Sequence, residues 1–204
     1  MPSATHATIA LFPLNTVLFP GGPLRLRIFE PRYLDMVSRC MREDSGFGVA
    51  LIVAGREAGG AAQTVEIGTL ARIVDFEQLD DGLLGITARG EQRFRIVHVH
   101  QENDGLNVCQ VEWRADEARA EVPPQHAVLA ELLRRALEQI GPAYGEVTPA
   151  YEDASWVSMR LAEILPLAAI ERQELLELND GPERLHWLQS RLNIQESRDE
   201  SDDS

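Results

Sequence analysis

The chain of 204 residues is acidic, with a formal net charge of −14, and its 44% hydrophobic content is that of an ordinary globular protein. All nineteen basic residues are arginine, and the absence of lysine excludes Walker A ATPases, Ser–Lys hydrolases and Schiff-base enzymes. The acid excess disfavours a nucleic-acid partner, because neutralisation of phosphates supplies most of the affinity for nucleic acids.

The sequence predicts a cytoplasmic protein that does not bind membranes. No segment reaches the roughly 20 uninterrupted apolar residues that a membrane-spanning helix needs. Residues 1–8 lack the basic and apolar regions of a secretory signal. Cys40 and Cys109 do not form a close-spaced metal or redox motif, so we expect both to be reduced thiols.

The first half of the chain predicts short strands separated by turns. Leu24, Leu26 and Ile28 alternate with arginines, which places them on one buried face after the proline-glycine turn at residues 19–23. Further strands are predicted at residues 47–53, 65–76, 83–88, 93–99 and 106–113, with turns at 80–82, 89–90 and 103–105. This spacing is typical of antiparallel strands in a small barrel or sandwich.

One helix is expected within this strand-rich half, from Pro31 to about Met41. Proline suits the first helical position because its missing N–H would find no partner there, and Glu30 before it favours the positive end of the helix. The spacing of three and four residues places Leu34, Val37 and Met41 on a stripe that faces the core.

The second half predicts a helical bundle that begins after Pro123-Pro124. The first helix, residues 126–140, carries an apolar stripe made of Val128, Leu129, Leu132, Leu133, Ala136, Leu137 and Ile140. Burial of that stripe would contribute on the order of 10 kcal/mol before ordering costs. Further helices are predicted at 152–165, 168–178 and 182–192. The predicted organisation is a β domain at residues 1–118, a bundle at 119–195 and a disordered acidic tail at 196–204.

Three groups of segments, in order along the chain, resemble the N-terminal substrate-binding domain of Lon proteases. They are residues 9–33, including Phe29-Glu30-Pro31-Arg32-Tyr33; residues 68–73, 90–96 and 111–112; and residues 165–166, 173–177 and 184–185. The resemblance covers about residues 9–190. It implies an α+β fold, with a PUA-like, mostly antiparallel β pseudo-barrel followed by a C-terminal α-helical bundle. It also implies a stand-alone domain without the ATPase and peptidase parts of Lon.

The resemblance implies a binding module rather than an enzyme. In Lon this region helps to recognise unfolded or tagged protein substrates and supports assembly, and a similar domain occurs in cereblon, a substrate receptor of a ubiquitin ligase. We therefore expect the chain to bind unfolded or extended polypeptide segments or a protein partner, in proteolysis or quality control, without a cofactor. A nucleotide- or RNA-binding PUA-like module is the alternative. The sequence leaves a homo-oligomer open.

The candidate binding residues are Phe19, Phe29, Arg32 and Tyr33, around the proline-glycine turn and the start of the first helix. Aromatic residues and arginine are enriched at binding hot spots, so these residues predict an exposed aromatic lip that accepts apolar peptide side chains. The alternative interpretation is that they pack the corner between strand and helix, with Glu30 and Arg32 as a structural ion pair.

No catalytic residue is predicted. His98 and His100 lie on one face of a predicted strand, where they would form a metal site with Glu112 as a third ligand. A solvent-facing histidine pair is the preferred interpretation, so no metal is expected and a metal-dependent enzyme is the least favoured alternative. A hydrolase triad has no support, because the chain contains no Gly-x-Ser-x-Gly motif.

Overall fold

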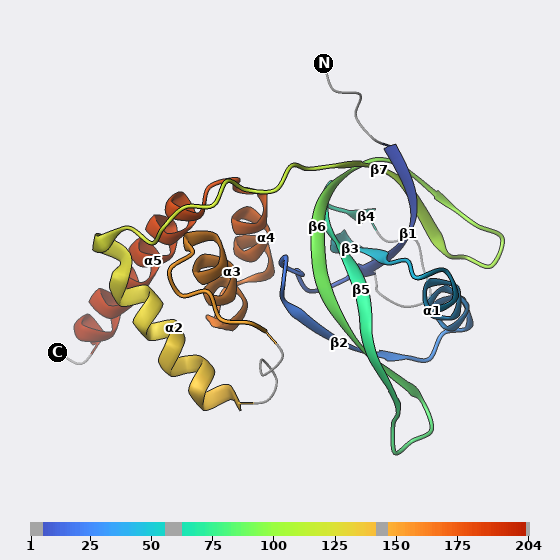
Figure 1. Cartoon of the computed structure of the whole chain (residues 1–204), viewed down its shortest axis with the longest axis horizontal. Helices are drawn as coiled ribbons and strands as arrows, with labels where there is room; N and C mark the ends of the chain where they lie inside the picture. Colours follow the sequence, from blue (N-terminus) through green and yellow to red (C-terminus); the bar gives the residue numbers. More distant parts are fainter. Residues whose placement is uncertain (1–5, 56–62, 142–146, 203–204) are drawn as a thin grey trace. The chain divides into compact units, whose positions relative to one another are not determined.

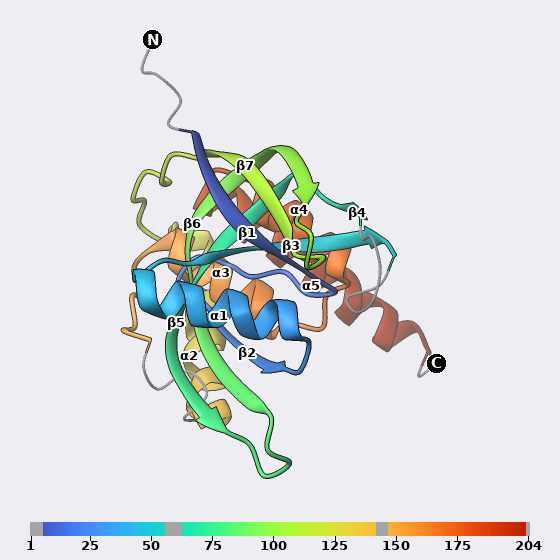
Figure 2. The same cartoon turned by 90° about the vertical axis from the view of Figure 1, so that its right-hand side faces the viewer.

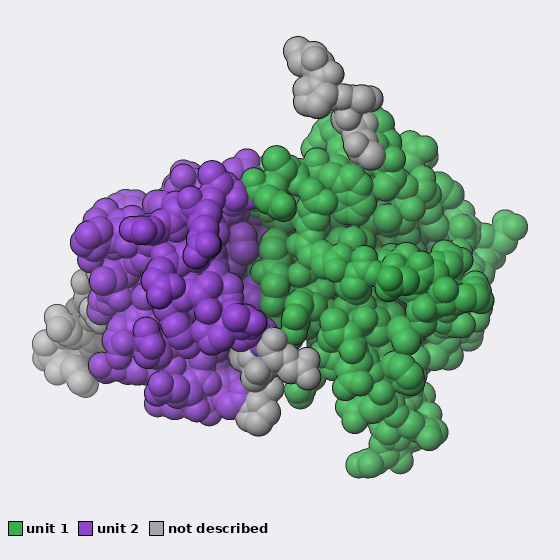
Figure 3. All heavy atoms as spheres, viewed as in Figure 1, with its two compact units in different colours: residues 1–116 green, residues 117–204 purple. Residues whose placement is uncertain are grey.

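The computed structural model describes residues 6–55, 63–141 and 147–202, without the side chains of residues 193–202. The chain divides into two compact units, residues 1–116 and 117–204, coloured green and purple in Figure 3. Among the described residues, the first unit holds the strands and one helix, and the second holds the remaining helices. The predicted α+β class is confirmed.

The strands of the first unit close into a barrel. They are β1 (His6–Leu14), β2 (Pro23–Ile28), β3 (Phe47–Ala54), β4 (Gln63–Thr64), β5 (Ile67–Gln78), β6 (Leu84–Gln101) and β7 (Asn107–Trp113). Neighbouring strands follow the order β1-β7-β6-β5-β3, and β1 also pairs with β3, which completes the ring (Figure 1). The β1–β3 pairing is parallel and the others are antiparallel, so the predicted pseudo-barrel is confirmed. β2 pairs with β6 outside this ring.

β6 corrects the prediction of two strands separated by a turn at Arg89-Gly90, because it runs through both residues without a break. The Gly90 N–H donates to the Gly22 carbonyl over 2.9 Å, and the Gly90 carbonyl accepts from the Gly21 N–H over 2.7 Å. A Cβ atom at Gly90 would lie 2.1 Å from the Phe19 carbonyl oxygen. Glycine is therefore required by the close approach of the β1–β2 connection, and not by a turn.

The helix of this unit, α1 (Pro31–Glu43), covers one side of the barrel (Figures 1 and 2). Its buried residues are Tyr33, Met36, Val37 and Cys40. The predicted stripe was correct only for Val37, because Leu34 and Met41 are 38% and 45% exposed. The buried face therefore includes the Tyr33 ring and the Cys40 thiol. These residues lie three or four positions from Met36 and Val37, which is the helical spacing of a single face.

A small core around Phe94 depends on two glycines. The Phe94 side chain is fully buried, and its cluster also contains Leu11, Ala50, Cys109 and Val111. A Cβ atom at Gly48 on β3 would lie 2.8 Å from the Phe94 ring, and one at Gly68 on β5 would lie 2.6 Å from it. Gly68 also faces the Val49 carbonyl oxygen, which would lie 2.4 Å from an added Cβ. The two glycines leave the space that the ring occupies.

The second unit contains η1 (Pro124–His126), α2 (Ala127–Ile140), α3 (Ala154–Ile164), α4 (Ala169–Glu177) and α5 (Gly181–Asp202). α3 packs against each of the other three α-helices of this unit. The backbone of α5 is helical as far as Asp202, and the disorder expected for residues 196–204 stays a prediction. No helix in the described part of the chain has the length and apolarity needed to cross a membrane.

α2 buries less of its apolar stripe than predicted. Only Leu129 and Leu133 are buried on this helix, whereas Val128, Leu132 and Ile140 are 64%, 40% and 42% exposed. Burial of these two leucines contributes about 3–6 kcal/mol, whereas burial of the whole stripe would contribute on the order of 10 kcal/mol. The apolar face of α2 is therefore wider than the surface that it packs on.

A fully buried arginine, Arg184, joins the elements of this second unit. Its Nη2 donates to the Glu117 carboxylate over 2.5 Å and to the Leu178 carbonyl over 2.9 Å. Its Nη1 donates to the Ser158 hydroxyl over 3.0 Å, and its Nε donates to the Leu175 carbonyl over 2.8 Å. Every guanidinium nitrogen thus has an acceptor, which is the condition for burying the charge.

Candidate binding site

The structure corrects the expected exposure of the aromatic lip at Phe19 and Tyr33. Phe19 is fully buried and Tyr33 is 3% exposed, whereas Phe29 is 58% exposed. The Tyr33 ring stacks on Phe12, with 3.8 Å between ring centroids and 12° between ring planes. Of these three aromatic residues, Phe29 is therefore the one whose side chain is largely exposed.

Arg32 lies at the corner between strand and helix. Its guanidinium pairs with the Glu30 carboxylate over 2.8 Å and donates to the Gly105 carbonyl over 2.7 Å. It also lies over the Tyr33 ring, 4.7 Å from the centroid, and its side chain is only 10% exposed. These contacts favour the alternative interpretation for Arg32, in which it holds the corner together.

Phe29 borders a concave surface that we call the β2 groove. The groove has a volume of about 200 Å³ and is lined by Phe12, Leu14, Arg25, Leu26, Arg27, Ile28, Phe29, Glu30 and Tyr33. Its lining includes residues 25–28 of β2 and the connection to α1, so the groove lies along the C-terminal part of that strand. The stacked rings of Phe12 and Tyr33 belong to this lining, together with the apolar side chains of Leu14, Leu26 and Ile28.

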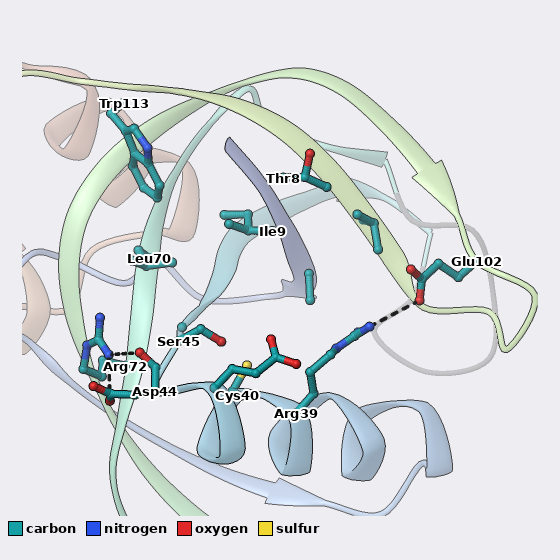
Figure 4. Close-up of a pocket in the computed structure, with 14 residues that line it drawn as sticks. Thr8, Ile9, Arg39, Cys40, Asp44, Ser45, Leu70, Arg72, Glu102 and Trp113 are labelled. Carbon is teal, nitrogen blue, oxygen red and sulfur yellow. Dashed lines mark hydrogen bonds and ion pairs between the residues drawn. The ribbon is translucent and has the colours of Figure 1, made fainter. Parts of the chain in front are cut away.

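A larger concavity, the Trp113 pocket, lies at the opposite end of α1 and has a volume of about 510 Å³ (Figure 4). It is lined by Thr8, Ile9, Ala10, Arg39, Cys40, Glu43, Asp44, Ser45, Gly46, Leu70, Arg72, Glu102, Val108 and Trp113. Figure 4 shows Trp113 and Leu70 on one side, and Arg39, Asp44 and Cys40 on the other. The volume is within the roughly 300–1,000 Å³ of small-molecule sites.

The arginines of the Trp113 pocket are already paired within the protein. Arg72 donates to Glu91 over 2.6 Å and to the Asp44 carboxylate over 3.2 Å. The hydrogen bond to Glu91 is the main reason that the pKa of Arg72 is raised. Arg39 lies 3.8 Å from the Glu102 carboxylate. An anionic ligand would have to compete with these carboxylates, so the pairing does not favour an anion in this pocket.

The predicted His98–His100 pair is exposed on β6, with 6.3 Å between ring centroids. Glu112, the third ligand of the metal hypothesis, instead accepts a hydrogen bond of 2.6 Å from Arg95. The described residues contain no group of three potential metal ligands. The geometry therefore gives the metal hypothesis no support.

Both cysteines are buried free thiols. Burial raises the pKa of Cys109 from its ordinary value of 9.0 to about 12. The pKa of Cys40 is also raised, and burial is again the main cause, opposed by a hydrogen bond with Ser45. Thiolates are the reactive form of cysteine, so neither residue has the lowered pKa of a catalytic thiol.

The raised pKa of Cys109 predicts a loss of stability at alkaline pH. Above pH 9 the unfolded chain releases the Cys109 proton while the folded chain keeps it, so the free energy of unfolding falls until about pH 12. The slope is up to about 1.4 kcal/mol per pH unit. Urea unfolding of the wild type and of Cys109→Ala between these pH values should give converging stabilities, and parallel curves would contradict the assignment.

Residues 8–193 match the family model of the ATP-dependent protease La (LON) substrate-binding domain. The chain belongs to the Lon substrate-binding domain family. A Lon N-terminal domain protein from Xanthomonas campestris has a crystal structure that superposes with a TM-score of 0.76. The two chains are 38% identical, and the match covers 90% of this chain and 98% of the Xanthomonas chain.

Longer proteins also match this chain over part of their length. Lon protease 2 of Myxococcus xanthus is 28% identical over 91% of this chain, which spans 23% of that protease. Protein cereblon of Danio rerio is 30% identical over 47% of this chain and 22% of its own length. The chain thus spans about a quarter of the length of the Lon protease that it matches. The Lon family resemblance inferred from the sequence is confirmed.

The sequence interpretation missed Phe12 and Leu14 in the β2 groove and Trp113 in the larger pocket. Phe12 and Leu14 are two residues apart on β1, a spacing that places both side chains on one face of a strand. That signal was available within residues 9–33. Trp113 ends the last predicted strand, and nothing in its spacing indicates a pocket.

Proposed function

We propose that this member of the Lon substrate-binding family is a non-catalytic, cytoplasmic module that binds extended polypeptide segments in proteolysis or protein quality control. Membership of a substrate-binding family supports a recognition role. The observation that carries the proposal is the β2 groove, where an exposed Phe29 side chain borders apolar walls beside a strand.

The dimensions of the β2 groove favour a polypeptide over a free small ligand. Its volume of about 200 Å³ is below the roughly 300–1,000 Å³ of small-molecule sites. One or two apolar side chains of a larger partner fit such a space, and the rest of the partner then lies along the surface. Phe29, more than half exposed in the free protein, gains burial when a segment covers it.

Replacement of Phe29 by alanine is expected to weaken peptide binding about tenfold, because burial of half an aromatic side chain contributes roughly 1–2 kcal/mol. Binding would be measured by fluorescence anisotropy of a labelled synthetic peptide rich in valine and phenylalanine. Phe76→Ala is the matched control, since Phe76 on β5 is 59% exposed and lies outside the groove lining.

The two variants separate a specific site from general hydrophobicity. Equal loss of affinity in both variants would mean that any exposed aromatic ring attracts the peptide. Unchanged affinity in Phe29→Ala would place the binding surface elsewhere. Either result would remove the β2 groove from the proposed function.

A further inference from the structure

One edge of β2 has no strand beside it in the described part of the chain. β2 is antiparallel to β6, with Leu24 opposite Ala88 and Leu26 opposite Ile86. The Gly90 N–H donates to the Gly22 carbonyl, so the main-chain carbonyl of residue 22 points toward β6. Bonding alternates along an antiparallel pair. The main-chain groups at positions 24, 26 and 28 therefore face β6, and those at positions 25 and 27 face the open edge.

The side chains of β2 have opposite chemistry on the two faces of the strand. Leu24, Leu26 and Ile28 belong to the core cluster or pack against it. Arg25 and Arg27 are exposed on the other face. Arg27 pairs with Asp81, whereas Arg25 makes no ion pair or side-chain hydrogen bond with the residues that the structure describes. A strand added to the edge would meet apolar side chains on one face and arginines on the other.

We propose that the partner segment binds as an additional strand along β2, and that the preferred segment alternates apolar and acidic residues. This inference rests on the proposed polypeptide binding. Apolar side chains of the segment enter the β2 groove beside Phe12, Leu14 and Tyr33. Acidic side chains then project to the opposite face, where they lie across from Arg25 and Arg27.

Charge complementarity selects this partner chemistry. The whole chain carries a net charge of −14, which disfavours acidic partners at long range. The edge of β2 instead presents two outward arginines, of which Arg27 pairs with Asp81 and Arg25 has no carboxylate beside it among the described residues. Main-chain hydrogen bonds contribute affinity in strand addition, and the alternating side chains contribute specificity.

The length of the open edge is limited at both ends. Pro23 has no N–H to donate at the start of β2, and Pro31 begins α1 soon after the strand ends. The edge thus offers main-chain groups over a few residues only, which suits a short extended segment and not a full additional sheet.

The first experiment compares three labelled peptides of equal length in which valine alternates with glutamate, glutamine or lysine. The full chain is expected to bind the glutamate peptide on the order of tenfold more tightly than the lysine peptide, with the glutamine peptide between them. Arg25→Glu should reduce or reverse this order. Arg42→Glu is the matched control, because Arg42 is 69% exposed on α1, lies outside the groove and changes the net charge equally.

The second experiment tests the main-chain contacts. Two forms of the glutamate peptide carry N-methyl groups either on every valine or on every glutamate. A bound strand directs alternate N–H groups toward β2, so one form is expected to lose binding and the other to keep it. If both methylated forms bind, or if neither does, the position of the methyl groups does not matter, and strand addition is overturned.

Failure of this inference is distinct from failure of the proposed function. If Phe29→Ala weakens binding but the three peptides bind equally, the groove binds polypeptides without the proposed specificity. The inference is then wrong, and the proposed function is unaffected. If none of the unmethylated peptides binds the wild type, both fall. An unchanged preference for glutamate in Arg25→Glu also overturns the inference, since the acidic side chains would then lie elsewhere.

Discussion

Replacement of Glu117 by alanine is expected to lower the free energy of unfolding of the helical unit by about 3–5 kcal/mol, because it leaves a buried arginine without its counter-ion. The Arg184 side chain is fully buried, and the Glu117 side chain is 6% exposed. The Glu117 carboxylate accepts from two nitrogens of Arg184 and from the Ser155 hydroxyl. Urea unfolding followed by the helical circular dichroism signal would measure the loss.

Glu131→Ala is the matched control for that variant. Glu131 on α2 pairs with Arg135 over 2.9 Å, but the two side chains are 50% and 72% exposed. Exposed pairs contribute about 1 kcal/mol or less, so this variant should unfold close to the wild type. A Glu117→Ala variant as stable as Glu131→Ala would show that the buried pair does not hold the unit together.

A double replacement tests the cause of the effect. Glu117→Met with Arg184→Met removes both charges and keeps apolar volume, and such replacements of buried ion pairs are often neutral or stabilising. We therefore expect the double variant to be more stable than Glu117→Ala. A double variant that is still less stable would mean that the hydrogen bonds of Arg184 to the Leu175 and Leu178 carbonyls carry most of the energy.

Local sequence patterns predicted the elements of this fold well. The alternation at Leu24, Leu26 and Ile28 predicted β2, and Pro31 marked the first residue of α1. The same rules failed at Gly90, because a glycine can serve either a turn or a close backbone approach. Its actual role depends on the Phe19 carbonyl, far away in sequence. Contacts between distant segments are not encoded in local periodicity.

The candidate site was predicted less completely than the fold. The motif around Phe29 lies beside the β2 groove, but composition could not show that Tyr33 turns inward to stack on Phe12. Burial of an aromatic residue depends on which surface lies beneath it, and that surface comes from β1. The open edge of β2 was equally invisible, since a strand's partners are set by the closure of the barrel.

Truncation of Phe94 to alanine is expected to lower the free energy of unfolding of the β unit by about 3–5 kcal/mol, because it leaves a cavity in the core around that ring. Phe94 is fully buried and contacts Trp113 edge-on, with 6.3 Å between ring centroids. Hydrogen exchange of the β6 amides would report the stability of this unit separately from the helices.

Two glycine substitutions reveal whether the space around Phe94 determines this stability. Gly48→Ala alone should be destabilising, since the atoms nearest to its Cβ would belong to the side chains of Phe94 and Ile9, at 2.8 and 3.0 Å. In the Phe94→Ala background most of that steric conflict is gone. The double variant should therefore lose about 0.5–3 kcal/mol less stability than the sum of the losses in the two single variants.

Gly68→Ala provides the contrasting case, because its Cβ would also lie 2.4 Å from the Val49 carbonyl oxygen. Truncation of Phe94 does not move that backbone atom, so Gly68→Ala should remain costly in either background. Equal rescue of both glycine variants would mean that β3 and β5 separate once the ring is removed. Rescue of Gly48→Ala alone would show that the strands keep their spacing and that the Phe94 ring fills a space fixed by the barrel.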